Sequence, residues 1–486
     1  MGYIEGAQRE QQILFPASLE EYVEDNSEVR VIDAFIGHLG FEELGFVRGE
    51  AAETGRPGYD PRIVLAIYIW GHLNRIRSSR RLERECSRNV ELMWLSGMLR
   101  PDFKTLCRFR QDNGKAIGKV LVQFRLWCQR EELFGSELVA IDGSKFKAVN
   151  STRRNMTQNK LTKLIESEKH LVAEYIAELD EADKREEERD NTREKLSAGE
   201  LKEKIDTIGE YLKEHEATLT GMKERGERQI SLTDPDARLM KTSKGMDVCY
   251  NIQTAVDAKH KLIATVEVTN EVNDQQLLSE MAVAAKSDLG VEELTVVADA
   301  GYYAHEVIKA CEDQNVTVYV PIRESRDAEQ RGVFPRERFE YDREQDLYVC
   351  PAGENLTPIG HNVRKARYAR TVRIYATGRC GDCPLRLKCT RSKYGRRIKR
   401  WIHDDVLDRL KKRLADKPEI QRMRKSIVEH PFGTIKSAMG HDRLLLKGIK
   451  NVTTEIKLTV LSYNIKRVIS ILGAQSMINK LKTQPV

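Results

Sequence analysis

Two aspartates follow runs of strand-forming residues and could serve metal-dependent chemistry. Asp142 comes directly after the apolar run 138–141, and Asp299 comes directly after the run 294–298, which is rich in β-branched residues. Each precedes a small residue, Gly143 or Ala300, a pattern typical of the end of a buried strand. We therefore expect both carboxylates at strand ends of one sheet, although an Asp-Gly pair taken alone more often marks a turn.

A third carboxylate lies far downstream, in a predicted helix. Positions 422, 425, 429 and 436 fall within about 60° of one another on an α-helix, so Glu429 shares one face with three cations, Arg422, Lys425 and Lys436. Pro431 and Gly433 interrupt this stretch, and a kink there would rotate Lys436 off the face. Taken alone, such a spacing usually makes a surface ion pair. Together, three carboxylates can hold Mg²⁺, which suits phosphoryl transfer on nucleic acid.

The composition narrows the class of protein. The chain has 486 residues, more than one ordinary core accommodates, so we expect two or three domains. The 81 basic and 75 acidic residues leave a net charge of +6, but the basic residues cluster between 361 and 400, where Asp382 is the one acid. Such a surface favours phosphates. No signal-peptide pattern and no apolar run long enough to span a bilayer is found, so we expect a cytoplasmic, nucleoid-associated protein without membrane contact.

Hydrophobic periodicity divides the chain into four parts. Residues 1–130 are predicted to be helical and DNA-binding, although their arginines are equally well explained by packing and pairing with nearby glutamates. Residues 131–330 carry strands, one of them predicted at 146–149, with intervening helices. At 155–228 they are interrupted by two amphipathic helices joined near 191–199, which we interpret as a structural hairpin or dimer contact rather than a DNA clamp. Residues 331–400 form a basic cysteine-containing insertion, and 401–486 supply the final helices. We expect a mixed α/β fold, a mixed sheet flanked by helices.

Nine cysteines in a chain without an export signal indicate a reducing compartment, where clustered thiols bind metal more often than they form disulfides. Four of them lie in or beside the basic segment: Cys350, Cys380, Cys383 and Cys389. Four thiolates can close a tetrahedral structural zinc site, and the insertion has few apolar residues to build a core. The spacing is irregular, so reduced cysteines without metal are an equal alternative. The other five are expected to be buried core residues.

In combination, these motifs resemble the Asp-Asp-Glu (DDE) triad of bacterial insertion-sequence transposases, and among them the group numbered eleven eighty-two. The resemblance rests on Asp142-Gly-Ser, Asp299-Ala-Gly-Tyr and the region of Glu429. That region matches the signature Y-(2)-R-(3)-E-(6)-K in spacing, with Arg422 in place of tyrosine and Lys425 in place of arginine. Further motifs at 59–61, 79–83, 101–103 and 236–257 extend the resemblance over nearly the whole chain. The family implies a ribonuclease-H-like catalytic domain.

The resemblance implies that Asp142 and Asp299 ligate two Mg²⁺ ions, for which Mn²⁺ can substitute, and that Glu429 completes one site. One ion would activate a water that attacks the phosphodiester at a transposon end, and the other would stabilise the leaving 3′ oxygen, before the freed 3′-OH attacks target DNA. Phosphates would be held by Arg422, Lys425 and Lys436. The implied partners are double-stranded DNA, as terminal inverted repeats and as target, and further copies of the chain in a homodimer or higher oligomer.

Two alternatives of other classes remain open. One is a catalytically inactive DNA-binding protein on the same fold, against which the intact set of three carboxylates argues. The other is a ribonuclease-H-like nuclease that cuts without joining, for which the helical N-terminal part and the basic insertion would be superfluous.

Overall fold

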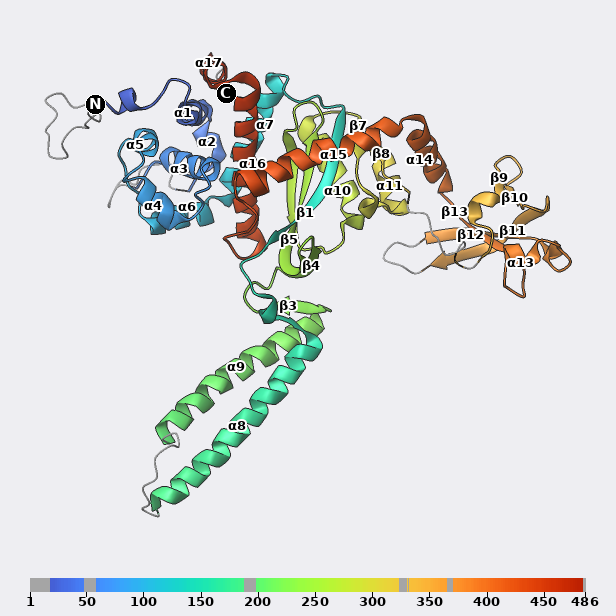
Figure 1. Cartoon of the computed structure of the whole chain (residues 1–486), viewed down its shortest axis with the longest axis horizontal. Coiled ribbons are helices and arrows are strands. Elements are labelled where there is room, and N and C mark those ends of the chain that lie inside the picture. The colour runs from blue at the N-terminus through green and yellow to red at the C-terminus, as the bar shows by residue number, and fades with distance from the viewer. Residues whose placement is uncertain are drawn as a thin grey trace, which may run out of the picture.

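The computed structural model describes residues 18–47, 58–187, 198–322, 330, 332–364 and 370–483. A central sheet carries three attachments, which extend from it in different directions (Figure 1). The N-terminal helices lie on one side of the sheet, and a sheet formed by the cysteine-containing insertion lies on the opposite side. A long helical hairpin projects away from both.

The central sheet has six strands and contains the strands that precede both aspartates. Its order is β4 (Arg238–Thr242), β5 (Gly245–Asp257), β1 (Leu138–Lys147), β7 (Leu294–Val297) and β8 (Val316–Tyr319), while β6 (Ile263–Thr269) also pairs with β5. β5 is antiparallel to β1, β4 and β6, whereas β7 and β8 run parallel to β1. This mixed sheet, flanked by helices, is the predicted ribonuclease-H-like fold.

β1 is longer than the sequence predicted. It continues through Asp142 and Gly143 as far as Lys147 and is paired with β5 from Val139 onward. The predicted turn at Asp142-Gly143 and the separate strand at 146–149 are therefore wrong. The polar stretch 142–145 interrupts the apolar run but not the strand, because backbone pairing with β5 does not depend on apolar side chains.

Alternate residues of β1 pack into two cores, one on each face of the sheet. Val139 and Ile141 join a core with α7 (Gly114–Arg130), α10 (Leu278–Leu289) and α16 (Ile449–Leu472). Ala140 and Phe146 join a second core with α15 (Pro418–Gly433) and with other residues of α16. Successive side chains of a strand point to opposite faces, so Asp142 shares the face of Ala140 and lies under α15.

The N-terminal helices share the first of these cores with the sheet. They are α1 (Glu28–His38), α2 (Phe41–Leu44), α3 (Pro61–Leu73), α4 (Ser79–Glu85), α5 (Val90–Leu95) and α6 (Phe103–Asp112), preceded by the short η1 (Leu19–Tyr22). α3 begins where the sequence predicts, because Pro61 fits a first helical turn and the Asp60 side chain accepts a bond from the Arg62 amide. The last helix, α17 (Ala474–Thr483), returns to α1, where the Leu481 carbonyl lies 3.1 Å from Nδ1 of His38.

The segment predicted as a helical hairpin contains two long antiparallel helices, α8 (Gln158–Glu187) and α9 (Ala198–Glu224), which extend away from the sheet (Figure 1). At their base, β2 (Asn155–Thr157) pairs with β3 (Gln229–Ser231), next to η2 (Thr152–Arg154). A small core fixes this base and consists of Leu161, Ile165, Met222 and Ile230. Most of the connection predicted near 191–199 lies outside the described residues. Among the described helices, including these long ones, none is apolar and long enough to cross a membrane.

The cysteine-containing insertion is a separate five-stranded antiparallel sheet. Its order is β13 (Arg397–Trp401), β12 (Arg370–Ala376), β11 (Asn355–Arg364), β10 (Leu347–Val349) and β9 (Glu340–Asp342), accompanied by η5 (Arg336–Arg338), η6 (Gly378–Cys380) and α13 (Arg386–Cys389). It has a core of its own, formed by Phe339, Tyr348, Leu356, Tyr375 and Ile398. The expectation that it lacks apolar residues for a core is therefore wrong. α14 (Asp404–Asp416) packs beside α11 (His305–Glu312) and leads back to the central sheet through α15 (Figure 1).

Candidate active site

Asp142 lies in the middle of β1, and Asp299 lies at the same level, two residues beyond the end of the neighbouring parallel strand β7. Ala140 of β1 pairs with Val297 of β7, and two residues further along each chain come Asp142 and Asp299. The Asp299 side chain caps the short helix η4 (Ala300–Tyr302) by accepting a bond of 2.6 Å from the Gly301 amide. Strand register thus brings two carboxylates, far apart in the sequence, to the level at which β7 ends beside β1.

The two carboxylates interact electrostatically. Burial raises the pKa of Asp142 from 3.8 to about 6, while the Arg424 guanidinium opposes this rise and the charges of Asp299 and Asp274 add to it. A divalent cation bound by both aspartates would relieve the same repulsion. Carboxylate oxygens are also the ligands that Mg²⁺ prefers. The residues present therefore fit a magnesium ion.

Arg424 of α15 reaches directly into this site. Its Nη1 lies 3.2 Å from Oδ2 of Asp142, and the two side chains are 18% and 24% exposed. One turn earlier, Nε2 of Gln421 donates to the Tyr319 carbonyl at 2.6 Å, which anchors α15 across the end of β8. Arg424 was not among the residues predicted from the sequence. Its position one helical turn before the buried Val428 was the signal that could have found it.

Behind Asp142, on the other face of the sheet, a polar network packs against the backbone of β1. A Cβ atom on Gly143 would lie 2.1 Å from Nε2 of Gln253 and 2.9 Å from Oδ1 of Asp274, so this position requires glycine. The Asp274 oxygen accepts bonds from three donors at 2.6–3.0 Å, and the Tyr302 hydroxyl donates to Oε1 of Gln253 at 2.5 Å. The whole network comprises Lys145, Asn251, Gln253, Asp274 and Tyr302. It was not foreseen from the sequence.

The predicted stripe on α15 divides into two parts. Arg422, Lys425 and Glu429 are exposed, whereas Lys436 is half-buried and turned toward the sheet. Its Nζ donates to Oγ of Ser144 at 2.6 Å and lies 4.4 Å from the centre of the Phe146 ring. The cause is a π-helical turn, η7 (Thr434–Ala438), which follows Gly433 and changes the helical register. The expectation of one continuous face is therefore wrong for Lys436.

Glu429 lies five residues beyond Arg424 on the same helix. Within the described parts of the chain, no group of three or more His, Cys, Asp or Glu side chains stands close enough to hold a metal ion. The structure thus brings Asp142 and Asp299 together and places Glu429 on the helix that covers them, but it does not gather all three carboxylates around one point.

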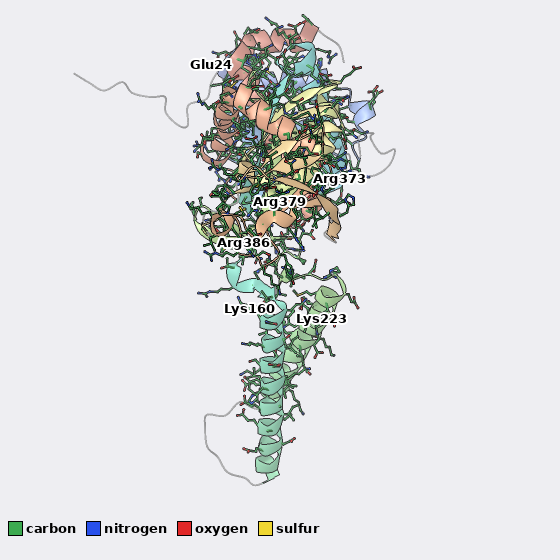
Figure 2. The ribbon with its side chains drawn as sticks, turned by 90° about the vertical axis from the view of Figure 1, so that its right-hand side faces the viewer. Glu24, Lys160, Lys223, Arg373, Arg379 and Arg386 are labelled. Atoms are coloured by element: carbon green, nitrogen blue, oxygen red, sulfur yellow. The ribbon has the colours of Figure 1, made fainter. Side chains whose placement is uncertain are left out.

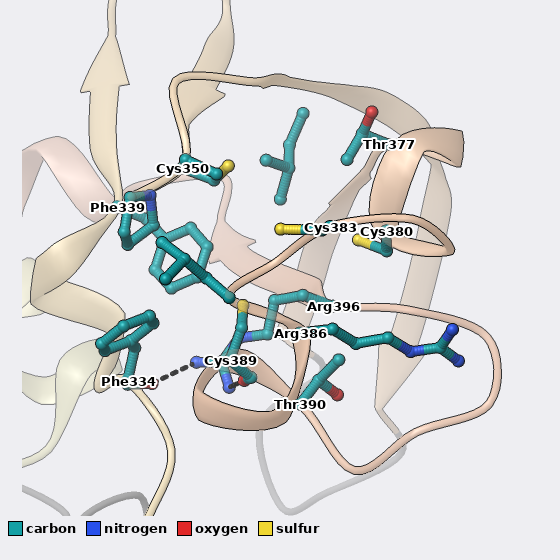
Figure 3. Close-up of a pocket in the computed structure, with 14 residues that line it drawn as sticks. Phe334, Phe339, Cys350, Thr377, Cys380, Cys383, Arg386, Cys389, Thr390 and Arg396 are labelled. Carbon is teal, nitrogen blue, oxygen red and sulfur yellow. Dashed lines mark hydrogen bonds between the residues drawn. The ribbon is translucent and has the colours of Figure 1, made fainter.

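The four clustered cysteines line one pocket of the insertion. In Figure 3 the side chains of Cys350, Cys380, Cys383 and Cys389 surround it, beside Phe334, Phe339 and the aliphatic part of Arg396. The pocket has a free volume of about 20 Å³. That is room for one water or ion rather than for an organic ligand. Burial raises the pKa of the Cys389 thiol, Arg396 lowers it, and the other three thiols raise it, so the four sulfurs are near neighbours.

Some N-terminal arginines predicted either to dock on DNA or to pair with glutamates are held within the fold. Arg77, with a side chain that is 10% exposed, makes an ion pair of 2.9 Å with Glu455 of α16. Arg88 pairs with Glu85 three residues before it. For these two residues the packing interpretation holds.

Other basic side chains gather on the outer surface of the insertion. Figure 2 shows Arg373, Arg379 and Arg386 there, at a distance from Lys160 and Lys223 at the base of the hairpin. Arg373 pairs with Asp346 at 2.7 Å.

Two family models match the chain. One, described as Transposase domain (DUF772), matches residues 17–112, and the other, described as Transposase DDE domain, matches residues 349–469. The second match includes the four cysteines, Glu429 and Lys436, whereas Asp142 and Asp299 lie outside both. No curated protein matches the sequence. A solved piggyBac transposase, in a synaptic complex with hairpin DNA, shares 9% sequence identity, with 94% of this chain and 79% of that chain covered, but its TM-score of 0.33 is too low to support an inference. The two transposase models, matched at separate parts of the chain, indicate an insertion-sequence DDE transposase, and the group numbered eleven eighty-two is consistent with both matches.

Proposed function

We propose that Asp142, Asp299 and Glu429 are the catalytic triad of this transposase and hold two Mg²⁺ ions, which Mn²⁺ can replace. The observation that supports the proposal most directly is the register of β1 and β7, which sets the two aspartates side by side beneath α15. Glu429 projects from that same helix on its exposed side. As the third carboxylate, Glu429 would supply a further oxygen ligand of the kind that Mg²⁺ prefers.

In this proposal the protein positions DNA around the metal site. The bound ions would lower the pKa of an attacking water and stabilise the leaving 3′ oxygen. Arg424 would exchange the Asp142 carboxylate for a phosphate of the scissile strand, because the metal then supplies the positive charge that Asp142 needs. Lys436, fixed beside Ser144, adds positive charge at the same edge of the sheet. Arg422 and Lys425, exposed on α15, would hold the backbone further out.

Cleavage and strand transfer are both in-line displacements, with water as the nucleophile in the first and a DNA 3′-OH in the second. No covalent link between protein and DNA is required. The DNA partners in this scheme are double-stranded, as transposon ends and as target. Both ends must be processed together, so the working form would be a homodimer or a higher oligomer.

For the insertion, we propose that Cys350, Cys380, Cys383 and Cys389 bind one structural Zn²⁺. Support comes from their position around a pocket of single-ion size. Rotation of the thiol side chains must close the site, because no group of metal-holding ligands is formed among the described residues. Cys383→Ser should lower the zinc content from one per chain to well below that value, whereas Cys107→Ser, in the N-terminal part, should leave it unchanged. Equal zinc content in both variants would refute this assignment.

The proposed reaction is tested with labelled DNA that carries the two ends of the element, incubated with the full chain and MgCl₂. Joined product supports the transposase mechanism. Cut product without joining indicates a nuclease, and a shifted but chemically unchanged band indicates a DNA-binding protein without activity. Asp142→Asn should abolish cleavage while DNA binding is retained, because it removes a metal ligand and little surface. Asp313→Asn, which alters an exposed carboxylate paired with Lys309, is the matched control and should cleave normally.

A further inference from the structure

A tight turn in the insertion displays an aromatic ring to solvent. Tyr394, between α13 and β13, is 66% exposed, although a tyrosine ring of this size is usually at least half covered. The turn itself is well fixed. The Tyr394 amide donates to Oγ of Ser392 at 3.2 Å, and the Gly395 amide donates to the Ser392 carbonyl at 3.2 Å.

The turn is packed against the cysteine pocket. Gly395 has a φ of +80°, and a Cβ atom there would lie 2.9 Å from Cβ of Cys380 and 3.1 Å from its sulfur. The next residue, Arg396, donates to the carbonyls of Cys389 and Phe334, each at 3.1 Å. The Tyr394 ring is therefore presented on a rigid support, and little conformational entropy is lost when a ligand covers it.

Two cations flank the exposed ring. Nζ of Lys393 lies 4.9 Å from the ring centre, and the guanidinium carbon of Arg397 lies 5.7 Å from it. Within the described part of the chain, neither cation makes an ion pair with a carboxylate. Between residues 379 and 400 the sequence contains a single acid, Asp382. This surface combines an exposed aromatic ring with two cations beside it that have no carboxylate partner among the described residues.

We propose that Tyr394, Lys393 and Arg397 form a binding site for unpaired DNA, in which the ring stacks on one base and the two cations hold the adjoining phosphates. The inference rests on the proposed function as a DNA transposase. It specifies unpaired DNA as a partner, a form of DNA that the proposed function leaves open. A base offers a flat face of the same kind to every aromatic ring, so recognition is independent of sequence. Inside a duplex both faces of a base are already stacked, whereas strands freed at a cleaved transposon end expose them.

Binding is measured by fluorescence anisotropy with the full chain, without magnesium, on three labelled probes of equal length. These are a single strand of twelve thymidines, the same strand with abasic sugars in place of the bases, and a blunt duplex. Tyr394→Ala should weaken binding of the thymidine strand by between about fivefold and a hundredfold, the value of one base–aromatic stack. The abasic strand and the duplex should change little. Tyr394→Phe should bind like the original protein, because the ring is retained.

Tyr211→Ala is the matched control, since Tyr211 is 53% exposed on α9 of the helical hairpin and should not affect any probe. The double change Lys393→Gln with Arg397→Gln should weaken binding of the thymidine strand and of the abasic strand alike. For single strands it should also reduce the slope of log affinity against log salt concentration by about 1.4, or about 0.7 for each lost phosphate contact. Thermal unfolding of each variant confirms that the fold is kept.

Three outcomes would overturn the proposal. One is that Tyr394→Ala binds the thymidine strand as tightly as the original protein, and another is that it loses equal affinity for the abasic strand. The third is that poly-glutamate competes with the thymidine strand as well as unlabelled DNA does, which would indicate an acidic protein as the partner. Because the probes are measured without magnesium and no step here requires catalysis, the anisotropy result does not depend on whether end DNA is cleaved. Failure of the triad and failure of this site are thus distinguished.

Discussion

Replacing Asp142 with asparagine should stabilise the metal-free protein at neutral pH, even though it removes a proposed metal ligand. Burial raises the pKa of this carboxyl from 3.8 to about 6, so the folded protein binds the proton more tightly than the unfolded chain does. The stability associated with Asp142 is therefore fully present below pH 4 and is lost as the pH rises toward 6. Since one pKa unit is 1.36 kcal/mol, a rise of about 2 units costs about 3 kcal/mol above pH 6. Asparagine resembles the protonated form and avoids that cost.

The assay is thermal and urea unfolding in EDTA at pH 4 and pH 7.5. Asp142→Asn should unfold at a higher temperature than the original protein at pH 7.5, by several degrees, and at the same temperature at pH 4. Asp346→Asn is a control of opposite sign. The pKa of Asp346 is held below its usual value, chiefly by the Tyr375 hydroxyl, so its stabilising effect is present at pH 7.5 and is lost in acid. That variant should be less stable than the original protein at pH 7.5, with a smaller difference at low pH.

Added magnesium should make the original protein more stable than Asp142→Asn at pH 7.5, the reverse of the order expected in EDTA. The original protein gains stability from an ion that binds only its folded form, and Asp142→Asn gains less. Arg424→Gln should lower the metal-free stability at pH 7.5, because it removes the cation that offsets the Asp142 charge, and the double variant should recover that loss. A metal-free Asp142→Asn protein that is no more stable at pH 7.5, or equally stabilised at pH 4 and pH 7.5, would refute this account of the site.

Two further substitutions test neighbouring parts of the site. Gly143→Ala should lower the free energy of unfolding by about 1–3 kcal/mol, because its Cβ would lie 2.1 Å from Nε2 of Gln253. The control Gly209→Ala, in open space on α9, should raise it slightly. Thermal unfolding measures both changes. Lys436→Met should slow cleavage of labelled end DNA by tenfold or more, with partial recovery in Lys436→Arg, because either cation can bond to Ser144 and carry charge to the sheet edge. Equal rates in the methionine and arginine variants would show that charge at this position is immaterial.

The strands, the N-terminal helices and the helical hairpin could be predicted because each has a local hydrophobic period. The continuation of β1 beyond Asp142 could not. Its polar stretch was mistaken for a turn, since the partners that occupy the Gly143 face come from β5, from η3 (Asp274–Gln276) and from η4. Those segments are more than a hundred residues away in the sequence. A glycine required by a distant side chain leaves no local pattern.

Arg424 illustrates a second limit. Helical spacing shows which residues share a face, and it grouped Arg422, Lys425 and Glu429 correctly as one exposed set. It does not show which face meets the sheet. The face of α15 that meets the sheet is determined by Ile427 and Val428, which share a buried core with Ala140 and Val297. This orientation directs Arg424 toward Asp142. The same packing, followed by the π-helical turn, carries Lys436 inward, which the ideal helical period could not anticipate.

The cysteine-containing insertion lies next in sequence to elements that form the candidate site. The cysteine-containing sheet lies in sequence between β8 and α15, the helix that carries Arg424 and Glu429. Ion pairs connect the end of this insertion to α14. Arg400, near the end of β13, pairs with Asp408 at 2.9 Å and with Asp404 at 3.7 Å, both on α14. Asp404 also pairs with Arg336. α14 is in turn joined to α11 by Arg413 and Glu312 at 2.7 Å. The insertion is thus joined to the central part of the protein by ion pairs as well as by the chain, and α14 leads into α15, the helix that carries Arg424.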